Sequence, residues 1–237
     1  MNSSQSPEDA IKRRVAIAAA DEVVSGMTVG LGSGSTLAYF IEELGRRVRD
    51  GLRIVGVPTS FQARFLARQY GVPLQEAMDT EHVDLAVDGA DEIDPNGHLI
   101  KGAGGALVQE KVVASMAQRF VVIADESKRV SRLGEKFPVP VEVVMPAVRS
   151  VMRRLESLGA QVKLRELKGK VGPAISDNGH FLIDARFEHI ADAAALDREI
   201  NMISGVVGHG LFVNITDQVL IGRLSGEIER IELHRAR

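Results

Sequence analysis

Residues 82–125 read HVDLAVDGADEIDPNGHLIKGAGGALVQEKVVASMAQRFVVIAD and contain the pattern that decides the fold. The apolar run at 82–89 predicts a strand, the segment 106–118 predicts a helix, and the run at 120–125 predicts a second strand. A strand, a helix and a strand in this order are typical of a parallel sheet covered by helices. Residues 82–125 therefore predict one strand–helix–strand unit with a long polar loop in its middle.

The residues before this unit repeat the same alternation. Apolar runs at 27–32 and 53–60 predict strands, and the segments 36–48 and 61–71 predict the helices that follow them. A Ser-Pro pair at 6–7, followed by two acids, predicts the start of a further helix. Repeated alternation of this kind favours an α/β fold, with a Rossmann-like parallel-sheet domain that carries helices on both faces.

Four polar loops follow strands of the predicted sheet. In open parallel sheets, ligands bind beyond the carboxyl ends of the strands. These loops therefore converge on one edge, where a binding site is expected. They are GLGSGST at 30–36, VPTS at 57–60, DGADEID at 88–94 and ADESKR at 124–129.

The pattern changes at FPVPVEVVMP, residues 137–146. The order that follows is strand, helix, strand, strand, helix, strand, which is the ferredoxin-like α+β pattern. Two short strands in the tail are expected to return to the first domain. We therefore predict a Rossmann-like catalytic domain formed by 1–136 and 214–237, and a smaller ferredoxin-like domain at 137–213. The second domain's elements are expected at 141–145, 147–159, 161–167, 180–187, 195–203 and 206–213.

Composition excludes several classes of protein and of site. The 237 residues contain no cysteine, so disulfides and thiolate metal sites are excluded. Lys and Arg number 29 and Asp and Glu 32, and this net charge of −3 gives no general attraction to nucleic acid or anionic membrane. No apolar run is long enough to span a bilayer, and the N-terminus lacks the apolar region of a secretory signal. We expect a cytoplasmic protein without nucleic-acid or membrane partners, and the six scattered histidines predict no metal site.

The glycine loop at 30–36 allows two interpretations. Its backbone N–H groups and the following helix N-terminus form a natural phosphate cradle, or its glycines serve only tight packing. A Walker A loop is excluded because Ser35 stands where that motif has lysine. A dinucleotide loop is disfavoured because the third glycine comes one residue early and the next strand ends without an acid. A small phosphorylated ligand fits this loop better than ATP or NAD.

The acidic loop at 88–94 allows three interpretations: a solvated turn, a Mg²⁺ or Ca²⁺ site, or a proton-transfer site for a polyol. The loop lacks the ligand spacing of an EF-hand, and the chain continues with Lys101 instead of further oxygen ligands. A lysine near carboxylates can stabilise an enolate oxygen, and Glu110 in the next helix can act as a general base. Taken alone, however, Glu110 and Lys128 are ordinary surface residues.

Five motifs together resemble ribose-5-phosphate isomerase type A over nearly the whole chain. The resemblance implies interconversion of ribose 5-phosphate and ribulose 5-phosphate in the pentose phosphate pathway, without a metal or another cofactor. It also implies a sugar phosphate as the small-molecule ligand and a homodimer or homotetramer. The motifs are VGLGSGST, VDGADEID, IKGAGGALVQEK, IADESKRV and FPVPVEV, in this order.

The resemblance also implies roles for individual residues. Glu110 is expected to be the general base that moves a proton between C1 and C2 through an enediolate. Asp88 matches an aspartate linked to ring opening and to proton movement between hydroxyls, Asp91 a substrate-binding aspartate, and Lys101 a lysine near the substrate oxygens. The expected substrate-binding residues are Lys12, Ser33, Gly34, Ser35, Thr36, Asp88, Gly89, Ala90, Asp91, Lys101, Gly102, Ala103, Gly104 and Lys128.

Two positions depart from the family's common motifs. Ser33 replaces a threonine and keeps its hydroxyl, and Ala103 interrupts a run of three glycines. If position 103 required a positive φ, alanine there would cost roughly 1 kcal/mol.

Three other functions are compatible with parts of the pattern. A sugar-phosphate deaminase requires an amino-sugar site, and a CoA transferase uses a nucleophilic glutamate that acyl-CoA would label. A sugar-phosphate sensor domain requires no catalysis and is expected to carry a basic DNA-recognition helix. The only short basic run, IKRR at 11–14, lies in the first predicted helix, where it favours a solvated face.

Overall fold

The computed structural model describes residues 6–233, which divide into two compact units. Within those residues, unit 1 comprises the chain up to Gly89, Val112–Lys128, and the chain from Ile215 onward. Unit 2 comprises Ala90–Lys111 and Arg129–Asn214. The chain therefore passes between the units four times, twice within the acidic loop and the helix that follows it. No helix of the described residues is both long enough and apolar enough to cross a membrane.

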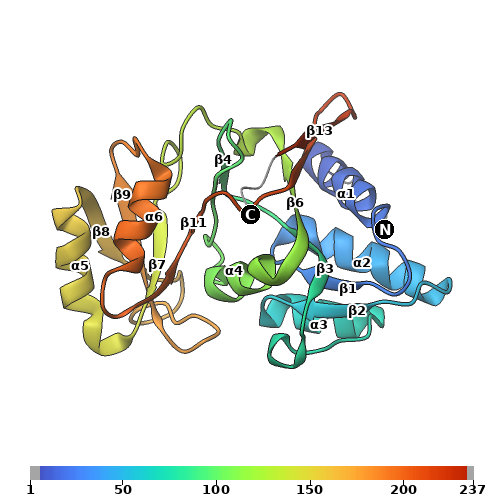
Figure 1. Ribbon diagram of the computed structural model, residues 1–237, viewed down its shortest axis with the longest axis horizontal. Coiled ribbons are helices and arrows are strands. Elements are labelled where there is room, and N and C mark those ends of the chain that lie inside the picture. Colours follow the sequence, from blue (N-terminus) through green and yellow to red (C-terminus); the bar gives the residue numbers. More distant parts are fainter. Residues whose placement is uncertain (1–5, 234–237) are drawn as a thin grey trace. The chain divides into compact units, whose positions relative to one another are not determined.

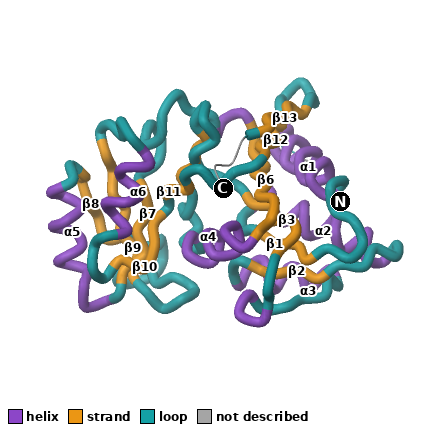
Figure 2. Tube along the Cα trace, in the orientation of Figure 1, coloured by secondary structure: helices purple, strands orange, loops and turns teal. Residues whose placement is uncertain are grey.

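Unit 1 contains a six-stranded sheet in the order β13-β12-β6-β3-β1-β2 (Figure 2). All neighbouring strands are parallel except β12 and β13, which form an antiparallel pair at one edge. The chain moves to one side from β1 to β2 and to the other side at β3, so the strand order reverses between β1 and β3. Open α/β sheets bind ligands at such a switch point. The strands are β1 (Thr28–Leu31), β2 (Val55–Pro58), β3 (Val83–Asp88), β6 (Ala117–Asp125), β12 (Gln218–Gly222) and β13 (Ile228–Glu232).

Helices cover both faces of this sheet. Val29 and Leu31 belong to a buried cluster that they share with residues of α1 (Pro7–Ala20), α2 (Ser35–Arg49) and α3 (Phe61–Tyr70). Figure 1 shows these three helices. Gly30 points to the opposite face, where an added Cβ would lie 2.6 Å from the side chain of Val113 in α4 (Leu107–Met116). The predicted parallel sheet with helices on both faces is confirmed.

The larger sheet of unit 2 has four antiparallel strands in the order β10-β7-β9-β8. Its element order is strand, helix, strand, strand, helix, strand, and the predicted ferredoxin-like α+β arrangement is confirmed. Val141, Leu155 and Ile183 are fully buried in the core between this sheet and its helices. The elements are β7 (Val139–Val143), α5 (Val148–Ser157), β8 (Ala160–Leu164), β9 (Phe181–Phe187), α6 (Ala193–Asn201) and β10 (Val206–His209).

Unit 2 also contains a small sheet in the order β11-β5-β4 that the sequence patterns did not predict. It consists of β4 (Glu92–Ile93), β5 (Leu99–Ile100) and β11 (Leu211–Phe212). β5 pairs with β11, and Ile93 forms a bridge to Arg129, so unit 2 takes in 90–111 and 129–136. The boundary expected from the sequence lay at 137. Short 3-10 helices complete the fold at Ala77–Asp79, Glu126–Lys128 and Met145–Ala147.

Candidate active site

Asp88 ends β3 at the switch point of unit 1 and is 2% exposed. Its Oδ1 accepts hydrogen bonds from the backbone N–H groups of Ser33 at 3.2 Å and Gly89 at 2.7 Å. A Cβ on Gly32 would lie 2.3 Å from the same oxygen, so only glycine at position 32 permits this close approach. The loop after β1 and the end of β3 therefore form one local structure around a buried carboxylate.

Hydroxyl groups from the loop after β2 hold Ser33. Its Oγ lies 2.7 Å from the Oγ of Ser60 and 3.0 Å from the Oγ1 of Thr59. The Gly34 N–H, at a φ of 102°, donates to Oε1 of Gln62 at 2.8 Å. The sequence indicated the 57–60 loop only as a neighbour of the site. The paired hydroxyls at 59 and 60, directly after a buried strand, are the signal that could have identified it as a support.

A cavity of about 510 Å³ in unit 1 brings together four of the predicted residues: Lys12, Ser35, Thr36 and Lys128. Ser35 is the first residue of α2, so the positive end of that helix lies at the cavity. Two ammonium groups, two hydroxyls and a helix N-terminus are the features that bind a phosphate group. The other lining residues are Glu8, Ile11, Asp125, Glu126, Ser127, Gly222 and Leu224.

In unit 2, Lys101 and Glu110 form a buried ion pair. The Lys101 Nζ lies 3.3 Å from Glu110 Oε2, and the two residues are 3% and 6% exposed. Lys101 follows β5 and its N–H donates to the Gly210 carbonyl at 2.9 Å, while Glu110 lies in the first turn of α4. A buried carboxylate can accept a proton as a general base. An ammonium group beside it can stabilise a negative charge that develops on a neighbouring oxygen.

Asp91 closes the loop that follows Lys101. Its Oδ2 accepts the Ala103 N–H at 2.9 Å, and its own N–H donates to the Ile100 carbonyl at 2.9 Å. Gly102 and Gly105 have positive φ of 100° and 82°. Among the described residues the only non-glycine residue with positive φ is Asn214, so Ala103 carries no such strain. Ala103 and Gly104 are exposed, and Gly89 and Ala90 are half-buried.

The other two acids of the 88–94 loop serve the structure of unit 2. The fully buried Glu92 accepts backbone N–H groups from Gly134 at 2.6 Å, Lys136 at 2.5 Å and Phe137 at 2.7 Å. Asp94 closes the turn before β5 by accepting the N–H groups of residues 96 and 98. Across residues 6–233, no three His, Cys, Asp or Glu side chains are grouped so that they could hold a metal ion.

A second lysine, Lys111, shares an aromatic neighbour with Lys101. The centre of the Phe212 ring is 5.5 Å from the Lys101 Nζ and 5.0 Å from the Lys111 Nζ. Burial lowers the pKa of Lys111 to about 8, and burial lowers the pKa of His209 to about 3. Both side chains face Asp197, at 3.9 Å and 3.5 Å, whose pKa is raised by burial.

The lowered pKa of Lys111 gives a prediction for stability. An unfolded lysine titrates near 10.5, so between pH 8 and 10.5 the unfolded chain binds more protons than the folded protein and stability rises with pH. We expect the free energy of unfolding of the wild type, measured relative to Lys111→Met, to increase by on the order of 2 kcal/mol across this window. Urea unfolding of both proteins at pH 7, 8, 9 and 10 measures it. A difference that does not change with pH would show that the ammonium is not desolvated.

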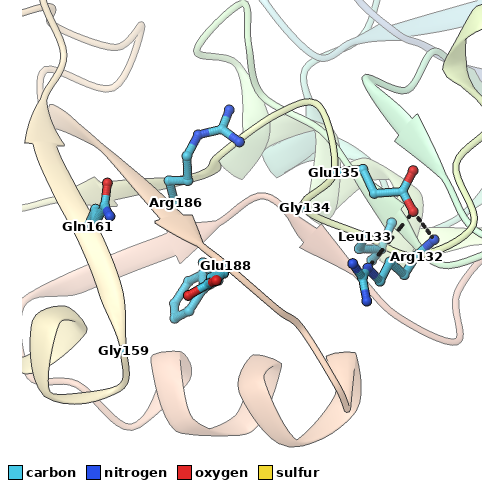
Figure 3. A pocket seen from close by; sticks show the side chains of 9 residues that line it. Arg132, Leu133, Gly134, Glu135, Gly159, Gln161, Arg186 and Glu188 are labelled. Atoms are coloured by element: carbon cyan, nitrogen blue, oxygen red, sulfur yellow. Dashed lines mark hydrogen bonds and ion pairs between the residues drawn. The ribbon is translucent and has the colours of Figure 1, made fainter.

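Unit 2 also has a cavity of about 410 Å³ that contains none of the predicted site residues. In Figure 3 the carboxylate of Glu135 points toward Arg132, and the Arg186 side chain extends from β9. The charged residues that line this cavity are Arg132, Glu135, Arg186 and Glu188, so two positive charges balance two negative ones. This cavity offers no excess of either charge to a ligand.

Comparisons with known proteins agree on one family. A family model described as Ribose 5-phosphate isomerase A (phosphoriboisomerase A) matches residues 55–226. The chain is similar to ribose-5-phosphate isomerase A of Thermosynechococcus vestitus, with 52% identity over 92% of this chain and 94% of that protein. It is also similar to ribose-5-phosphate isomerase A of Methanothermobacter thermautotrophicus, with 51% identity over 91% of this chain and 95% of the relative.

Solved structures agree with the sequence comparisons. Ribose 5-phosphate isomerase A from Methanocaldococcus jannaschii matches with a TM-score of 0.91 and 47% identity, covering 95% of this chain and 99% of that one. A D-ribose-5-phosphate isomerase in complex with phospho-erythronic acid matches with a TM-score of 0.92 and 41% identity, covering 98% and 100% of the two chains.

Proposed function

This chain belongs to the ribose 5-phosphate isomerase A family, and from that premise we propose which of its residues carry the reaction. The protein is an aldose–ketose isomerase that interconverts D-ribose 5-phosphate and D-ribulose 5-phosphate. The observation that carries the assignment of roles is the buried pair of Lys101 and Glu110, 3.3 Å apart. An isomerase of this kind needs a base for a carbon-bound proton and a positive charge for the oxygen that becomes negative.

In the proposed mechanism Glu110 removes the proton from C2 of the open-chain aldose. The electron pair of that bond forms the C1–C2 double bond of an enediolate, and the carbonyl oxygen at C1 takes the negative charge. Lys101 stabilises this charge, which is larger in the transition state than in the substrate. Glu110 then returns the proton to C1 while the hydroxyl proton at C2 moves to the oxygen at C1. The substrate and product have the same composition, and the enzyme ends unchanged.

We assign the two aspartates to the hydroxyl groups of the sugar. Asp88 is held by two backbone N–H groups at one oxygen, which fixes the direction of its carboxylate. This supports a role in ring opening and in moving protons between hydroxyls. Asp91 is fixed in the same way by the Ala103 N–H, which supports a role in binding the substrate. Only Gly89 and Ala90 separate the two aspartates in the sequence.

We assign the phosphate group to the cavity of unit 1. Its volume of about 510 Å³, its two lysines and the start of α2 support this assignment. Ser33, in the loop that precedes this helix, is held by Thr59 and Ser60 and contributes to the same loop structure.

Replacing Lys128 with alanine is expected to raise the KM for ribose 5-phosphate about tenfold or more, with kcat changed little. A hydrogen bond to a charged group contributes about 1.5–3 kcal/mol to binding, and 1.4 kcal/mol corresponds to a factor of ten. The lost interaction is present in the ground state and in the transition state, so KM changes and kcat does not. Lys168→Ala, at an exposed lysine of unit 2, is the matched control. An unchanged KM in Lys128→Ala would remove this lysine from the phosphate site.

The direct test is turnover of ribose 5-phosphate by purified protein in the presence of EDTA. We expect full activity, because the proposed chemistry uses only side chains of this chain. Activity that is lost in EDTA and restored by a divalent cation would overturn metal independence but leave the reaction in place. Binding of ribose 5-phosphate without turnover would indicate a sensor instead of an enzyme.

We also propose that the protein is a homodimer or homotetramer and that it acts in the cytoplasm. The resemblance of its motifs to the family supports the assembly, and the absence of a long apolar run in the sequence agrees with the location. Sedimentation velocity at micromolar concentration tests the first proposal, and fractionation of the source cells tests the second.

A further inference from the structure

Arg165 lies directly after β8, and its side chain makes hydrogen bonds to three groups of unit 2. Its Nη1 donates to the carbonyl of Gly102 at 2.9 Å and to the carbonyl of Ala103 at 3.1 Å. Its Nε donates to both carboxylate oxygens of Asp184 at 3.1 Å, and its Nη2 donates to Asp184 as well. The Arg165 side chain is 11% exposed, so these partners replace most of its hydration.

The two carbonyls belong to the loop that joins Lys101 to the helix of Glu110. The Gly102 carbonyl and the Ala103 N–H are the two polar groups of one peptide unit, and in a trans peptide they point in opposite directions. Arg165 binds the oxygen end of this unit, and Asp91 binds the N–H end at 2.9 Å. The peptide is therefore held between a guanidinium on one side and the substrate-binding aspartate on the other.

Within the loop, one backbone hydrogen bond adds to these contacts: the Gly105 N–H donates to the Gly102 carbonyl at 3.0 Å. Gly102 and Gly105 have positive φ, and glycine has no strong preference for such values over others. Ala103 and Gly104 are exposed, and a Cβ added to Gly104 would meet no atom within 4 Å. A glycine-rich segment that is exposed at its middle has many conformations open to it, so a further contact such as that of Arg165 restricts it to one arrangement.

We propose that Arg165, oriented by Asp184, is a positioning residue of the isomerase that fixes Asp91 through the Gly102–Ala103 peptide. The inference rests on the proposed function, in which Asp91 binds the sugar hydroxyls. Arg165 does not touch the substrate in this proposal. Its guanidinium polarises the peptide, which strengthens the hydrogen bond from the Ala103 N–H to Asp91 and holds that carboxylate in one direction. A cavity of about 340 Å³ is lined by Asp91, Ala103, Arg165 and Asp184, which places all four side by side in unit 2.

The kinetic test compares Arg165→Met, Arg165→Lys and a matched control, Arg186→Met. Arg186 is exposed on β9 and donates to a single backbone carbonyl, that of Lys136, at 3.0 Å. We expect Arg165→Met to lower kcat/KM by roughly 10–100-fold, because misplacement of about 1 Å can have effects of that size. Arg165→Lys keeps one charged donor and is expected to retain an intermediate activity, whereas Arg186→Met stays within twofold of the wild type.

A double-mutant cycle with Asp91→Ala separates positioning from general stability. If Arg165 acts through Asp91, Arg165→Met has a much smaller effect on kcat/KM in the Asp91→Ala background than in the wild type. Equal effects in both backgrounds, or an Arg165→Met variant as active as the Arg186→Met control, would overturn the inference.

Amide hydrogen exchange in the substrate-free protein gives a readout that does not depend on activity. We expect the Ala103 amide to exchange at least tenfold faster in Arg165→Met and at the wild-type rate in Arg186→Met. An unchanged exchange rate at Ala103 would contradict the proposal that Arg165 holds the Gly102–Ala103 peptide. If the wild-type protein is inactive but the exchange effect is still seen, the proposed function is refuted, while the contact by which Arg165 holds the Gly102–Ala103 peptide is supported.

Discussion

Replacement of Glu110 by glutamine is expected to lower kcat for ribose 5-phosphate by about 10²–10⁴-fold, which is the usual contribution of a positioned general base. Glutamine has nearly the same shape as glutamate and still accepts a hydrogen bond from Lys101. It cannot take up a proton from carbon. Because the lost interaction is made in the transition state, KM is expected to change little.

The matched control for this change is Glu156→Gln, at an exposed glutamate of α5, which should leave both kinetic constants unchanged. Glu110→Asp keeps the carboxylate but shortens its reach by one carbon atom, so its activity should lie between those of the wild type and Glu110→Gln. Thermal unfolding of each variant shows whether the protein is folded in the assay. A folded Glu110→Gln variant with kcat near the wild-type value would exclude Glu110 as the base.

The sequence predicted the larger elements of the fold because their signals are local. Helix α3 begins after Ser60, whose side chain accepts the Ala63 N–H, and it ends at Gly71 with a φ of 76°. A serine before the first turn and a glycine after the last one are visible in the sequence itself. The expected helix at 61–71 therefore agrees with Phe61–Tyr70 to within one residue.

The small sheet of unit 2 could not be predicted in the same way. Its strands β4, β5 and β11 have two residues each, too few to show an alternation of apolar and polar side chains. Their pairing depends on a distant contact, since the Lys101 N–H donates to the Gly210 carbonyl more than a hundred positions away. A Cβ at Gly210 would lie 2.1 Å from the Lys101 carbonyl oxygen, so this glycine permits the approach.

The same limit applies to the candidate site. The sequence shows that acidic residues are concentrated at 88–94, but it does not show which of them serve the fold and which are available to a ligand. Glu92 is a structural residue because three N–H groups from 134–137 surround it, and the sequence contains no mark of that contact. The partnership of Arg165 with Gly102 and Ala103 also joins distant parts of the chain. The types of residue in the sequence indicated the chemistry of the site. Contacts between distant parts of the chain decide which of the acidic and basic side chains can take part in that chemistry and which serve the fold.

Replacement of Lys101 by methionine is expected to affect activity and stability together. Loss of the positive charge at the enediolate oxygen should lower kcat by about 10²–10³-fold, as the removal of one such donor does in other enzymes. The same change leaves the carboxylate of Glu110 buried at 6% exposure without its ammonium partner. Breaking a buried ion pair at one side typically costs about 3–5 kcal/mol, so we expect a large drop in the free energy of unfolding.

A double variant, Lys101→Met with Glu110→Gln, separates the two effects. Both charges are then absent, and the remaining side chains are close in volume to the originals, so most of the lost stability should return. Activity should not return, because neither the base nor the positive charge is present. Urea unfolding of the wild type, both single variants and the double variant measures the coupling energy of the pair. The control is Arg154→Met, which breaks the ion pair of Arg154 and Glu199, whose side chains are 54% and 55% exposed and whose charged atoms lie 3.5 Å apart. Its free energy of unfolding should change by less than about 1 kcal/mol. A double variant as unstable as Lys101→Met would mean that the lysine contributes through packing and not through its charge.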